Sequence, residues 1–502
     1  MDQEPIVNLD CHCNNYKWGK KGRKSEVANL YAAGHSNFSI DENQTYSELW
    51  MGTHPHGPAM VRKSSTLLSK MIKEESFTRT ESNNNLSKDV RTQHHLPYIM
   101  KVMSIDQTLS LQVHPTKEQA AILHQRDPKN YPDRNHKPEL AYAFTRFELL
   151  CGFRPVDELL KNLEAFASLR ELFGNYYCQN LICLLRQSPD PDDFETKRAL
   201  KKCFSHMMEV PAERVTELID ELLKQLDNGI CGSLSEDTIG VIRKINRECE
   251  EENRIRDVGV FSPLFLNHMI LEPGECCYYA AEELHAYISG ECVECVGCSN
   301  NTIRAAMTPK YIDRPALIEV LNYRMTSQEH YLVPAVTLPN YPAVDEYSPD
   351  CKDFQLHRVR VEQGQTNVQI PALECGSIMV ILGGSGVIEE VPSASNELHE
   401  SNNDEKINRH VKRGDIFYIR PGTRLRFASC TADLEGFRTF SYEDGPDHES
   451  RLNDGLCNRS TISDSIKQHN MSSQIAEISI KGKDRLDGGV VFSVDTEMDG
   501  CL

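Results

Sequence analysis

The sequence lacks any long apolar segment. None of its apolar runs reaches the roughly 18 residues that a transmembrane helix needs, and its first residues, M-D-Q-E-P-I-V-N-L-D, are acidic without the apolar core of a signal peptide. We therefore expect a cytoplasmic protein that has no membrane as a partner.

Positive charge is also scarce. The 502 residues include 55 Lys and Arg against 74 Asp and Glu, which gives a formal net charge of -19. A field of this sign repels polyanions, so we expect no nucleic acid and no anionic lipid surface as partner. A phosphorylated ligand would need a local basic pocket.

A disulfide framework is missing as well. The 18 cysteines are scattered through a long chain rather than spaced as in a small secreted scaffold, so we expect reduced thiols. Cys292, Cys295 and Cys298 form a C-x-x-C-x-x-C run, but no C-x-x-x-C-P follows it. On a strand, a spacing of three sends successive side chains to opposite faces. The run therefore does not predict an iron–sulfur cluster.

The apolar pattern changes along the chain. About one domain per 150 residues suggests roughly three units. Strand-like alternation covers 109–153, apart from a helix that begins with the capping box of Thr116 and Gln119. A helical period runs from 156 to about 253 and indicates about four helices, and strand patterning returns from Phe261 to about 444.

Turns and loops are expected at several places. Pro273-Gly274 and Gly290-Glu291 indicate turns, and 377–390 and 413–423 are predicted as hairpin-like segments. The polar stretches at about 75–90 and 392–410 are predicted as surface loops. The tail at 446–502 is predicted to be loosely ordered, because it is polar and poor in large apolar residues.

Four side chains form a candidate metal site. They are Gln112, His114, Glu139 and His285, which lie in the sequence stretches S-L-Q-V-H-P, H-K-P-E-L and E-L-H-A-Y. Alternation places Gln112 and His114 on one face of a strand. Two imidazoles, a carboxylate and an amide oxygen favour zinc over magnesium or calcium. The residues are too far apart in sequence for a zinc finger, so they would have to converge across a sheet or barrel.

The sequence motifs around these residues are more specific evidence of function than the spacing between the residues. They resemble the signatures of type I mannose-6-phosphate isomerases, in order from about residue 8 to about residue 440. The matching stretches are Y-K-W-G-K-K-G-R-K-S-E-V-A (16–28), Y-S-E-L-W-M-G-T-H-P (46–55), L-P-Y-I-M-K-V (96–102), Y-P-D-R-N-H-K-P-E (131–139), C-G-F-R-P (151–155), H-A-Y-I-S-G-E (285–291) and N-T-I-R-A-A-M-T-P-K (301–310).

The resemblance implies a mainly β fold with a helical insertion, made of two cupin-like β-barrels plus an α-helical domain. The catalytic barrel would comprise 1–155 and 256–320, the helical domain 156–255 and the second barrel 321–445, which we expect to hold no metal. The implied enzyme is a monomer with one zinc ion. It would interconvert D-mannose 6-phosphate and D-fructose 6-phosphate through a cis-enediolate and supply GDP-mannose synthesis.

The resemblance also assigns roles to residues. Gln112, His114, Glu139 and His285 match the family's zinc ligands, and Arg304 matches its catalytic arginine. A guanidinium suits that role because it presents two parallel N–H donors to a developing oxyanion. For the substrate's phosphate and hydroxyls, the candidates are Lys101, Lys137, Lys310 and the neutral donor Ser110. His136 is a candidate for ring opening or proton transfer.

One departure from the family pattern leaves an alternative open. Asn300 stands where the family reads Asp, in the sequence S-N-N before Thr302. If that carboxylate transfers protons, the chain would be a noncatalytic sugar-phosphate-binding paralogue. If it only orients Arg304 or the substrate, an amide would serve. If only the His and Glu residues are considered, a metal-dependent cupin of oxygenase type is a third alternative.

Overall fold

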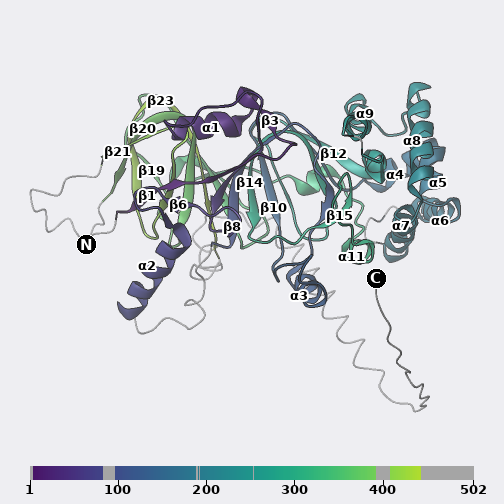
Figure 1. The fold of residues 1–502 in the computed structure, drawn as a ribbon, viewed down its shortest axis with the longest axis horizontal. Helices are drawn as coiled ribbons and strands as arrows, with labels where there is room; N and C mark the ends of the chain where they lie inside the picture. Colours follow the sequence, from purple (N-terminus) through teal and green to yellow (C-terminus); the bar gives the residue numbers. More distant parts are fainter. Residues whose placement is uncertain are drawn as a thin grey trace, which may run out of the picture. The chain divides into compact units, whose positions relative to one another are not determined.

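The computed structural model describes residues 4–82, 96–187, 190, 193–252, 254–391 and 408–442. Strand and helix occur in nearly equal shares, about 33% and 31%. Figure 1 shows two groups of strands and a group of helices, α4 to α9, that lies beside β12. The expected combination of β-sheet with a helical insertion is confirmed, with more helix than "mainly β" implied.

The first large sheet carries the candidate site. Its ten antiparallel strands follow the order β12-β11-β14-β8-β5-β2, with β9, β10, β13 and β15 attached through further pairings. β8 lies near the middle, and every residue of its sequence Y-I-M-K-V-M-S-I is buried. The bounds are β2 (His12–Asn14), β5 (Glu48–Gly52), β8 (Tyr98–Ile105), β9 (Leu111–Val113), β10 (Glu139–Ala143), β11 (Phe147–Phe153), β12 (Leu266–Leu271), β13 (Cys276–Tyr279), β14 (His285–Gly297) and β15 (Ile303–Ala306).

One of the two predicted turns in this sheet is confirmed and the other is wrong. Between β12 and β13, the Glu275 N–H donates to the Glu272 carbonyl at 3.0 Å, and Gly274 has a φ of 102°. At Gly290, by contrast, β14 continues through the residue. It pairs with β11 before this point and with β8 and β10 after it. Gly290 has a φ of 111°, so it serves as a bend within one strand.

The second large sheet joins the two ends of the folded chain. Its eleven strands follow the order β16-β17-β18-β23-β20-β22-β1-β6-β7, with β19 and β21 attached. The N-terminal β1 pairs with β22 near the C-terminal end. The bounds are β1 (Ile6–Asp10), β6 (Met60–Val61), β7 (Thr66–Leu67), β16 (Val336–Leu338), β17 (Tyr341–Tyr347), β18 (Gln355–Val361), β19 (Val368–Ile370), β20 (Ser377–Glu390), β21 (Asn408–Lys412), β22 (Ile416–Ile419) and β23 (Leu425–Phe440). β3 (Lys20–Lys21) and β4 (Thr45–Tyr46) form a separate pair.

The hairpin predicted at 377–390 is wrong. β20 runs through the glycines as one strand, and its register against β23 shifts at Gly383 and Ser385. Gly384 has a φ of 76°. Glycine at such a shift absorbs an extra residue as a β-bulge instead of reversing the chain.

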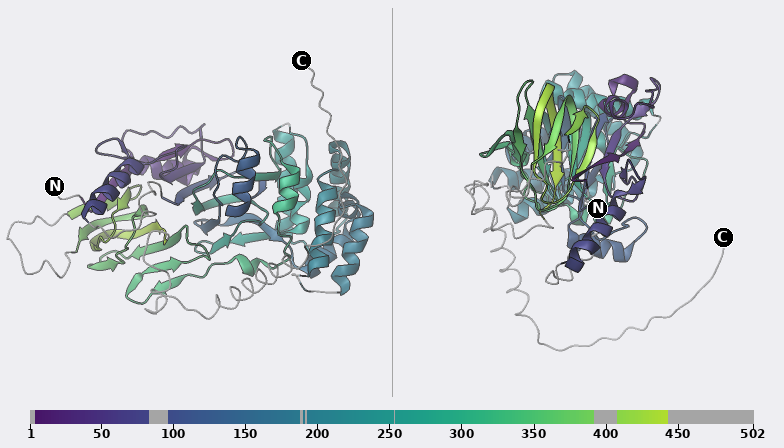
Figure 2. Two further views of the ribbon diagram at one scale, coloured as in Figure 1. Left: turned by 90° about the horizontal axis from the view of Figure 1, so that it is seen from below. Right: turned by 90° about the vertical axis from the view of Figure 1, so that its left-hand side faces the viewer.

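The insertion between β11 and β12 contains six helices of at least six residues in its described part, rather than about four. Amphipathic spacing made α8 easy to predict, because Val215, Leu218, Ile219 and Leu222 form one buried stripe. The prediction missed α5, which has only six residues, and α6, whose Tyr, Asn and Cys residues are weak helix formers. The bounds are α4 (Val156–Ala165), α5 (Ala167–Leu172), α6 (Asn175–Gln187), α7 (Phe194–Met207), α8 (Ala212–Asp227) and α9 (Glu236–Glu251). Figure 2 shows the same grouping from below.

The remaining helices are α1 (Glu26–Gly34), α2 (Leu68–Ser82), α3 (Lys117–Arg126), α10 (Ser262–Phe265) and α11 (Arg314–Val320). The predicted capping box of α3 is confirmed. The first part of the loop predicted at about 75–90 is wrong, because α2 extends to Ser82. Glu75 on this helix pairs with Arg420 at 2.7 Å. Residues 83–95, 392–407 and 443–502 lie outside the described residues. No described helix is both long and apolar enough to span a membrane.

A shared core fixes the two large sheets against each other. It includes Leu9 and Val380 from the second sheet together with Tyr98 and Leu140 from the first. The Tyr98 hydroxyl also donates to the Thr439 carbonyl across this core, at 2.8 Å. The strands that carry the candidate site therefore rest on a buried apolar support.

Candidate metal centre and active site

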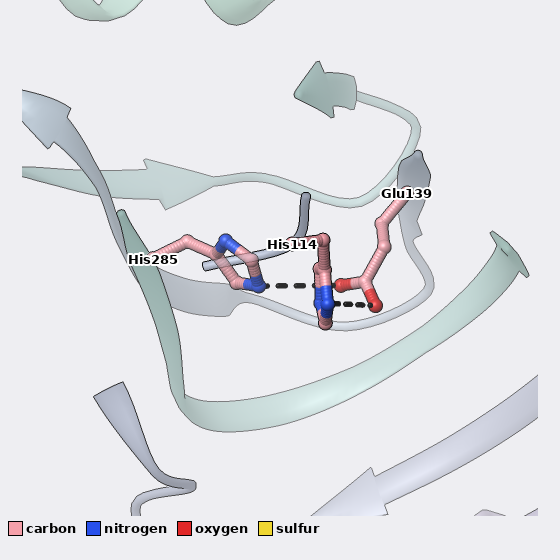
Figure 3. A group of neighbouring side chains, drawn as sticks. All are labelled: His114, Glu139 and His285. Carbon is pink, nitrogen blue, oxygen red and sulfur yellow. Dashed lines mark ion pairs between the residues drawn. The ribbon is translucent and has the colours of Figure 1, made fainter. Parts of the chain in front are cut away.

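Three strands of the first sheet bring His114, Glu139 and His285 together. His114 follows β9 directly, while Glu139 and His285 are the first residues of β10 and β14. Glu139 Oε1 lies 3.2 Å from His114 Nε2, and Glu139 Oε2 lies 3.5 Å from His285 Nε2 (Figure 3). Their ligand atoms all lie within 4.8 Å of one another. The predicted convergence is present, and all three side chains are buried.

Gln112, the fourth residue of the predicted quartet, lies beside both histidines. Its Nε2 lies 3.5 Å from the Nε2 atoms of both His114 and His285, and its Oε1 accepts from Ser110 Oγ at 3.0 Å. A metal needs the amide oxygen. Because amide oxygen and nitrogen have nearly the same shape, half a turn brings Oε1 to the histidines, and the Ser110 hydroxyl then accepts from the amide nitrogen.

Backbone carbonyls set the tautomers of both histidines. His114 Nδ1 lies 2.7 Å from the Asn301 carbonyl, and His285 Nδ1 lies 2.9 Å from the Glu283 carbonyl. A carbonyl only accepts, so each Nδ1 carries the proton and each Nε2 presents its lone pair to the other ligands. Burial lowers the pKa of His285 to about 3. Burial, together with Lys137, also lowers the pKa of His114, so both imidazoles are in the neutral form that binds metal.

Glu139 is held as a carboxylate. Burial alone would raise its pKa, but the ammonium of Lys137 holds the pKa well below its usual range. Lys137 Nζ lies 3.0 Å from Glu139 Oε1, which places this predicted substrate lysine beside the metal ligands. Two nitrogen and two oxygen donors of this kind fit zinc.

Lys101 lies behind these ligands. Its ammonium is 2.7 Å from Glu294 Oε2 and 3.4 Å from Glu48 Oε1, and the residue is only 6% exposed. Burial would lower the pKa of Lys101, but Glu294 and Glu48 raise it above its usual range. The structure therefore places Lys101 in a buried ion-pair network.

Two tyrosines link this network to the candidate metal ligand Glu139. The Tyr279 hydroxyl is 2.7 Å from Glu139 Oε2 and 2.8 Å from the Tyr287 hydroxyl. The Tyr287 hydroxyl in turn donates to Glu294 Oε1 at 2.9 Å. Sequence reasoning missed Tyr279, Tyr287 and Glu294. Alternation along the strand places Tyr287 on the same face as His285, which is a sequence pattern that could have identified it. The bend at Gly290 interrupts this alternation, so the sequence gives no comparable indication of Glu294.

Arg304 lies on β15, next to the candidate metal ligands. It is opposite Gln112 in the register between β15 and β9. Burial lowers the pKa of its guanidinium. Within the described part of the chain, no carboxylate pairs with it, so its donors remain available to a ligand.

A pocket of about 960 Å³ opens next to Arg304. Ser110 and Lys310, two of the predicted substrate-binding residues, line it, and burial together with Arg304 lowers the pKa of Lys310. Its charged lining residues are five cations and one carboxylate, namely Lys17, Lys21, Arg254, Arg304, Lys310 and Glu252. A cationic pocket in a chain of charge -19 is suited to an anionic ligand.

His136 and Lys101, which were also predicted to act on the substrate, have carboxylate partners instead. His136 Nε2 lies 2.9 Å from both carboxylate oxygens of Asp353, a residue that precedes β18. Neither His136 nor Lys101 is among the described residues that line the pocket. The structure thus gives His136 a partner in the C-terminal part of the chain.

The turn that contains Asn300 is held by Asp133. One oxygen of Asp133 accepts from the Asn300 backbone N–H at 2.8 Å, and the other accepts from Ser299 Oγ at 2.8 Å. The Asn301 amide also donates to Asp133. The turn that supplies the Asn301 carbonyl to His114 is therefore built without the Asn300 side chain.

The chain was compared with known proteins. Residues 6–156 match the family model of the catalytic domain of type I phosphomannose isomerase, and residues 172–266 match that of its helical insertion domain. Mannose-6-phosphate isomerase of Homo sapiens is 36% identical over 82% of this chain and 93% of its own length. The enzyme of Bos taurus is 35% identical over 84% and 94%, and that of Candida albicans is 31% identical over 88% and 99%.

Solved structures show the same fold. Mannose 6-phosphate isomerase from Salmonella typhimurium, bound to substrate and a zinc atom, superimposes with a TM-score of 0.66 at 24% identity, covering 87% of this chain and 99% of that one. A mannose 6-phosphate isomerase bound with zinc and yttrium gives a TM-score of 0.67 at 25% identity, over 87% and 99%. The chain belongs to the type I phosphomannose isomerase family of enzymes.

Proposed function

We propose that this protein is a zinc-dependent isomerase that interconverts D-mannose 6-phosphate and D-fructose 6-phosphate through a cis-enediolate. The observation that carries the proposal is the convergence of His114, Glu139 and His285 beside a cationic pocket and Arg304, which has no acidic partner among the described residues. The activity would supply mannose for GDP-mannose synthesis. We keep a monomeric, cytoplasmic enzyme as the expected form.

The proposed domains follow from the two sheets and the insertion. We propose that each large sheet is a cupin-like barrel: a catalytic one from 1–155 and 256–320, and a second one from 321–445, with the helical domain 156–255 between the parts of the first. Three strands of the N-terminal segment, β1, β6 and β7, join the second sheet, where β1 pairs with β22. The backbone of the N-terminal segment therefore contributes strands to both proposed barrels.

Zinc would be held by Gln112, His114, Glu139 and His285. When bound, it would supply Lewis-acid polarisation of the sugar's carbonyl and hydroxyl oxygens. The neutral imidazoles and the ionised Glu139 are already in the protonation states that a metal requires. The remaining steps depend on the chain's own side chains.

Arg304 would stabilise the oxyanion. The proton alpha to the sugar carbonyl must be removed and then returned to the neighbouring carbon, so negative charge develops on the carbonyl oxygen between these two steps. Arg304 is buried enough to have a lowered pKa and has no acidic partner among the described residues. Its two parallel N–H donors can therefore bind the developing charge.

The phosphate group would bind in the cationic pocket. Lys310 and Ser110 line the pocket together with Arg304. Lys137, next to Glu139, is closer to the metal and is better placed for the sugar's hydroxyls. Lys101 would act indirectly through Glu294, and His136 would tie the site to Asp353.

Asn300 supports a second candidate function, a noncatalytic sugar-phosphate-binding paralogue. The specific observation is the amide in place of the family's carboxylate. Against it, the turn around Asn300 is held by Asp133 through the backbone. The rate at which purified, zinc-loaded protein converts mannose 6-phosphate separates the two: turnover supports the isomerase, and binding without turnover supports the paralogue.

A further inference from the structure

Tyr279 touches two of the proposed zinc ligands at once. It is the last residue of β13 and lies opposite Glu139 in the register between β13 and β10. Its hydroxyl is 2.7 Å from Glu139 Oε2. Its ring lies against the imidazole of His285, with 4.3 Å between ring centroids and 34° between ring planes. The side chain is 1% exposed, so water does not compete for these contacts.

The hydroxyl fixes the orientation of the carboxylate. Glu139 can rotate about its terminal bond unless both oxygens are held. Lys137 Nζ holds Oε1 at 3.0 Å, and the Tyr279 hydroxyl holds Oε2 at 2.7 Å. An O–H donor to an ionised carboxylate makes a short, strong hydrogen bond. With both oxygens held, Oε1 lies 3.2 Å from His114 Nε2 and Oε2 lies 3.5 Å from His285 Nε2.

The hydroxyl is itself held in place. Its oxygen lies 2.8 Å from the Tyr287 hydroxyl, which donates to Glu294, and Glu294 pairs with the buried Lys101. The phenol of Tyr279 thus lies at the end of a buried row of polar side chains that reaches from Lys101 to the proposed zinc ligands. A side chain fixed at both its ring and its hydroxyl loses little freedom when the metal binds.

We propose that Tyr279 is a positioning residue of the metal centre, whose hydroxyl orients Glu139 and whose ring orients His285 for zinc binding. The proposal rests on the zinc site assigned under the proposed function. Partners of this kind raise metal affinity by about 10-fold to 100-fold when the ligands themselves are unchanged.

The test separates the hydroxyl from the ring. Tyr279→Phe removes only the hydroxyl, and Tyr279→Leu removes the ring contact as well. The matched control is Tyr278→Phe: Tyr278 is the neighbouring residue on β13, and its hydroxyl donates to the Asp350 carbonyl at 3.3 Å instead. Zinc dissociation constants are measured for metal-free proteins by competition with a chromophoric chelator.

We expect zinc affinity to fall at least about 10-fold in Tyr279→Phe and further in Tyr279→Leu, with Tyr278→Phe like the parent. At saturating zinc, the kcat of Tyr279→Phe should recover towards that of the parent. Equal zinc affinity in Tyr279→Phe and the parent would overturn the proposal. So would a loss of equal size in Tyr278→Phe, because it would reflect a general effect on β13.

Separate measurements distinguish a folding defect from a loss of zinc binding or of activity. Thermal unfolding of the metal-free variants shows whether each is folded, and Tyr279→Phe against Tyr278→Phe decides the proposal if Tyr279→Leu does not fold. If the parent binds zinc but does not isomerise mannose 6-phosphate, the proposed function fails while the order of zinc affinities still decides the role of Tyr279. If the parent isomerises and Tyr279→Phe binds zinc equally well, only the role of Tyr279 fails.

Discussion

Arg304 lies opposite Gln112 on neighbouring antiparallel strands, and Gln112 is also opposite His285 on β14. The proposed catalytic cation and two proposed zinc ligands thus occupy one row across three strands. Their separation is set by backbone register, which a side-chain substitution does not change. Substitutions in this row should therefore report on chemistry more than on folding.

Arg304→Lys should lower kcat by about 100-fold to 1,000-fold, the usual cost of losing an oxyanion donor. Lysine keeps the charge but lacks two parallel donors. Steady-state kinetics with mannose 6-phosphate measure the effect. The control is Arg254→Lys, because Arg254 lines the same pocket but pairs with Glu252. A kcat for Arg304→Lys close to that of the parent would contradict the assigned role.

Removal of zinc should abolish turnover and lower the melting temperature. A ligand present at 100 times its dissociation constant stabilises the folded state by about 2.7 kcal/mol. Added zinc should raise the melting temperature of the parent but not that of His285→Ala, which lacks one ligand. His410→Ala, an exposed histidine on β21, should respond like the parent. Scanning calorimetry with and without zinc gives the result, and an equal rise in His285→Ala would refute the ligand assignment.

Lys310→Ala should raise KM for the phosphorylated sugar more than it lowers kcat. Lys310 lines the cationic pocket, and binding made equally in the ground and transition states appears in KM. The effect should shrink as ionic strength increases, because the pocket is open to solvent. Lys129→Ala removes an exposed lysine elsewhere and should leave both constants unchanged. A drop in kcat with unchanged KM would place Lys310 at the reaction centre instead.

His268 should make the folded state sensitive to acid. Its side chain is 2% exposed, and its Nδ1 lies 3.1 Å from Thr238 Oγ1. Burial lowers its pKa from 6.5 to about 4. Between these values the unfolded chain binds more protons, so stability rises with pH from about 4 to 6.5 and levels off above. The contribution is on the order of 3 kcal/mol.

Urea unfolding at several pH values tests this account. His268→Asn should flatten the rise in unfolding free energy between pH 4 and 6.5, whereas His410→Asn on the exposed face of β21 should not. If His268→Asn keeps the full slope of the parent, the buried carboxylates rather than this imidazole account for the acid sensitivity.

Asn300→Asp should have a kcat similar to that of the parent. The backbone around residue 300 is already held by Asp133, and the proposed zinc ligands and Arg304 are complete without a carboxylate there. Parallel assays of both proteins decide the question. A large gain in rate from a nearly inactive parent would favour the noncatalytic paralogue instead.

The convergence of His114, Glu139 and His285 was the part of the site best predicted from sequence. Strand alternation predicted that Gln112 and His114 share one face of a strand, and the sequence motifs around Glu139 and His285 identified the other two donors. Lys101 was harder to place, because a sequence does not show that Glu48 and Glu294 will meet it across β5 and β14. Tyr279 was missed for a similar reason: its contact with Glu139 depends on the register between β13 and β10.

Glycine caused the clearest errors in the predicted fold. Gly290 and Gly384 have positive φ values, which are as compatible with a bulge or a bend as with a turn. Only the partners of β14 and β20 decide between these outcomes, and those partners are far away in the sequence. The α6 helix was missed because its stability comes from buried residues such as Leu181 and Leu185 rather than from local propensity.

The most direct test is a coupled assay of mannose 6-phosphate conversion by the purified, zinc-loaded protein, repeated after chelation and after zinc is restored. The account predicts formation of fructose 6-phosphate that is lost on chelation and regained with zinc. No turnover in the zinc-loaded protein, or turnover that is indifferent to the chelator, would contradict it.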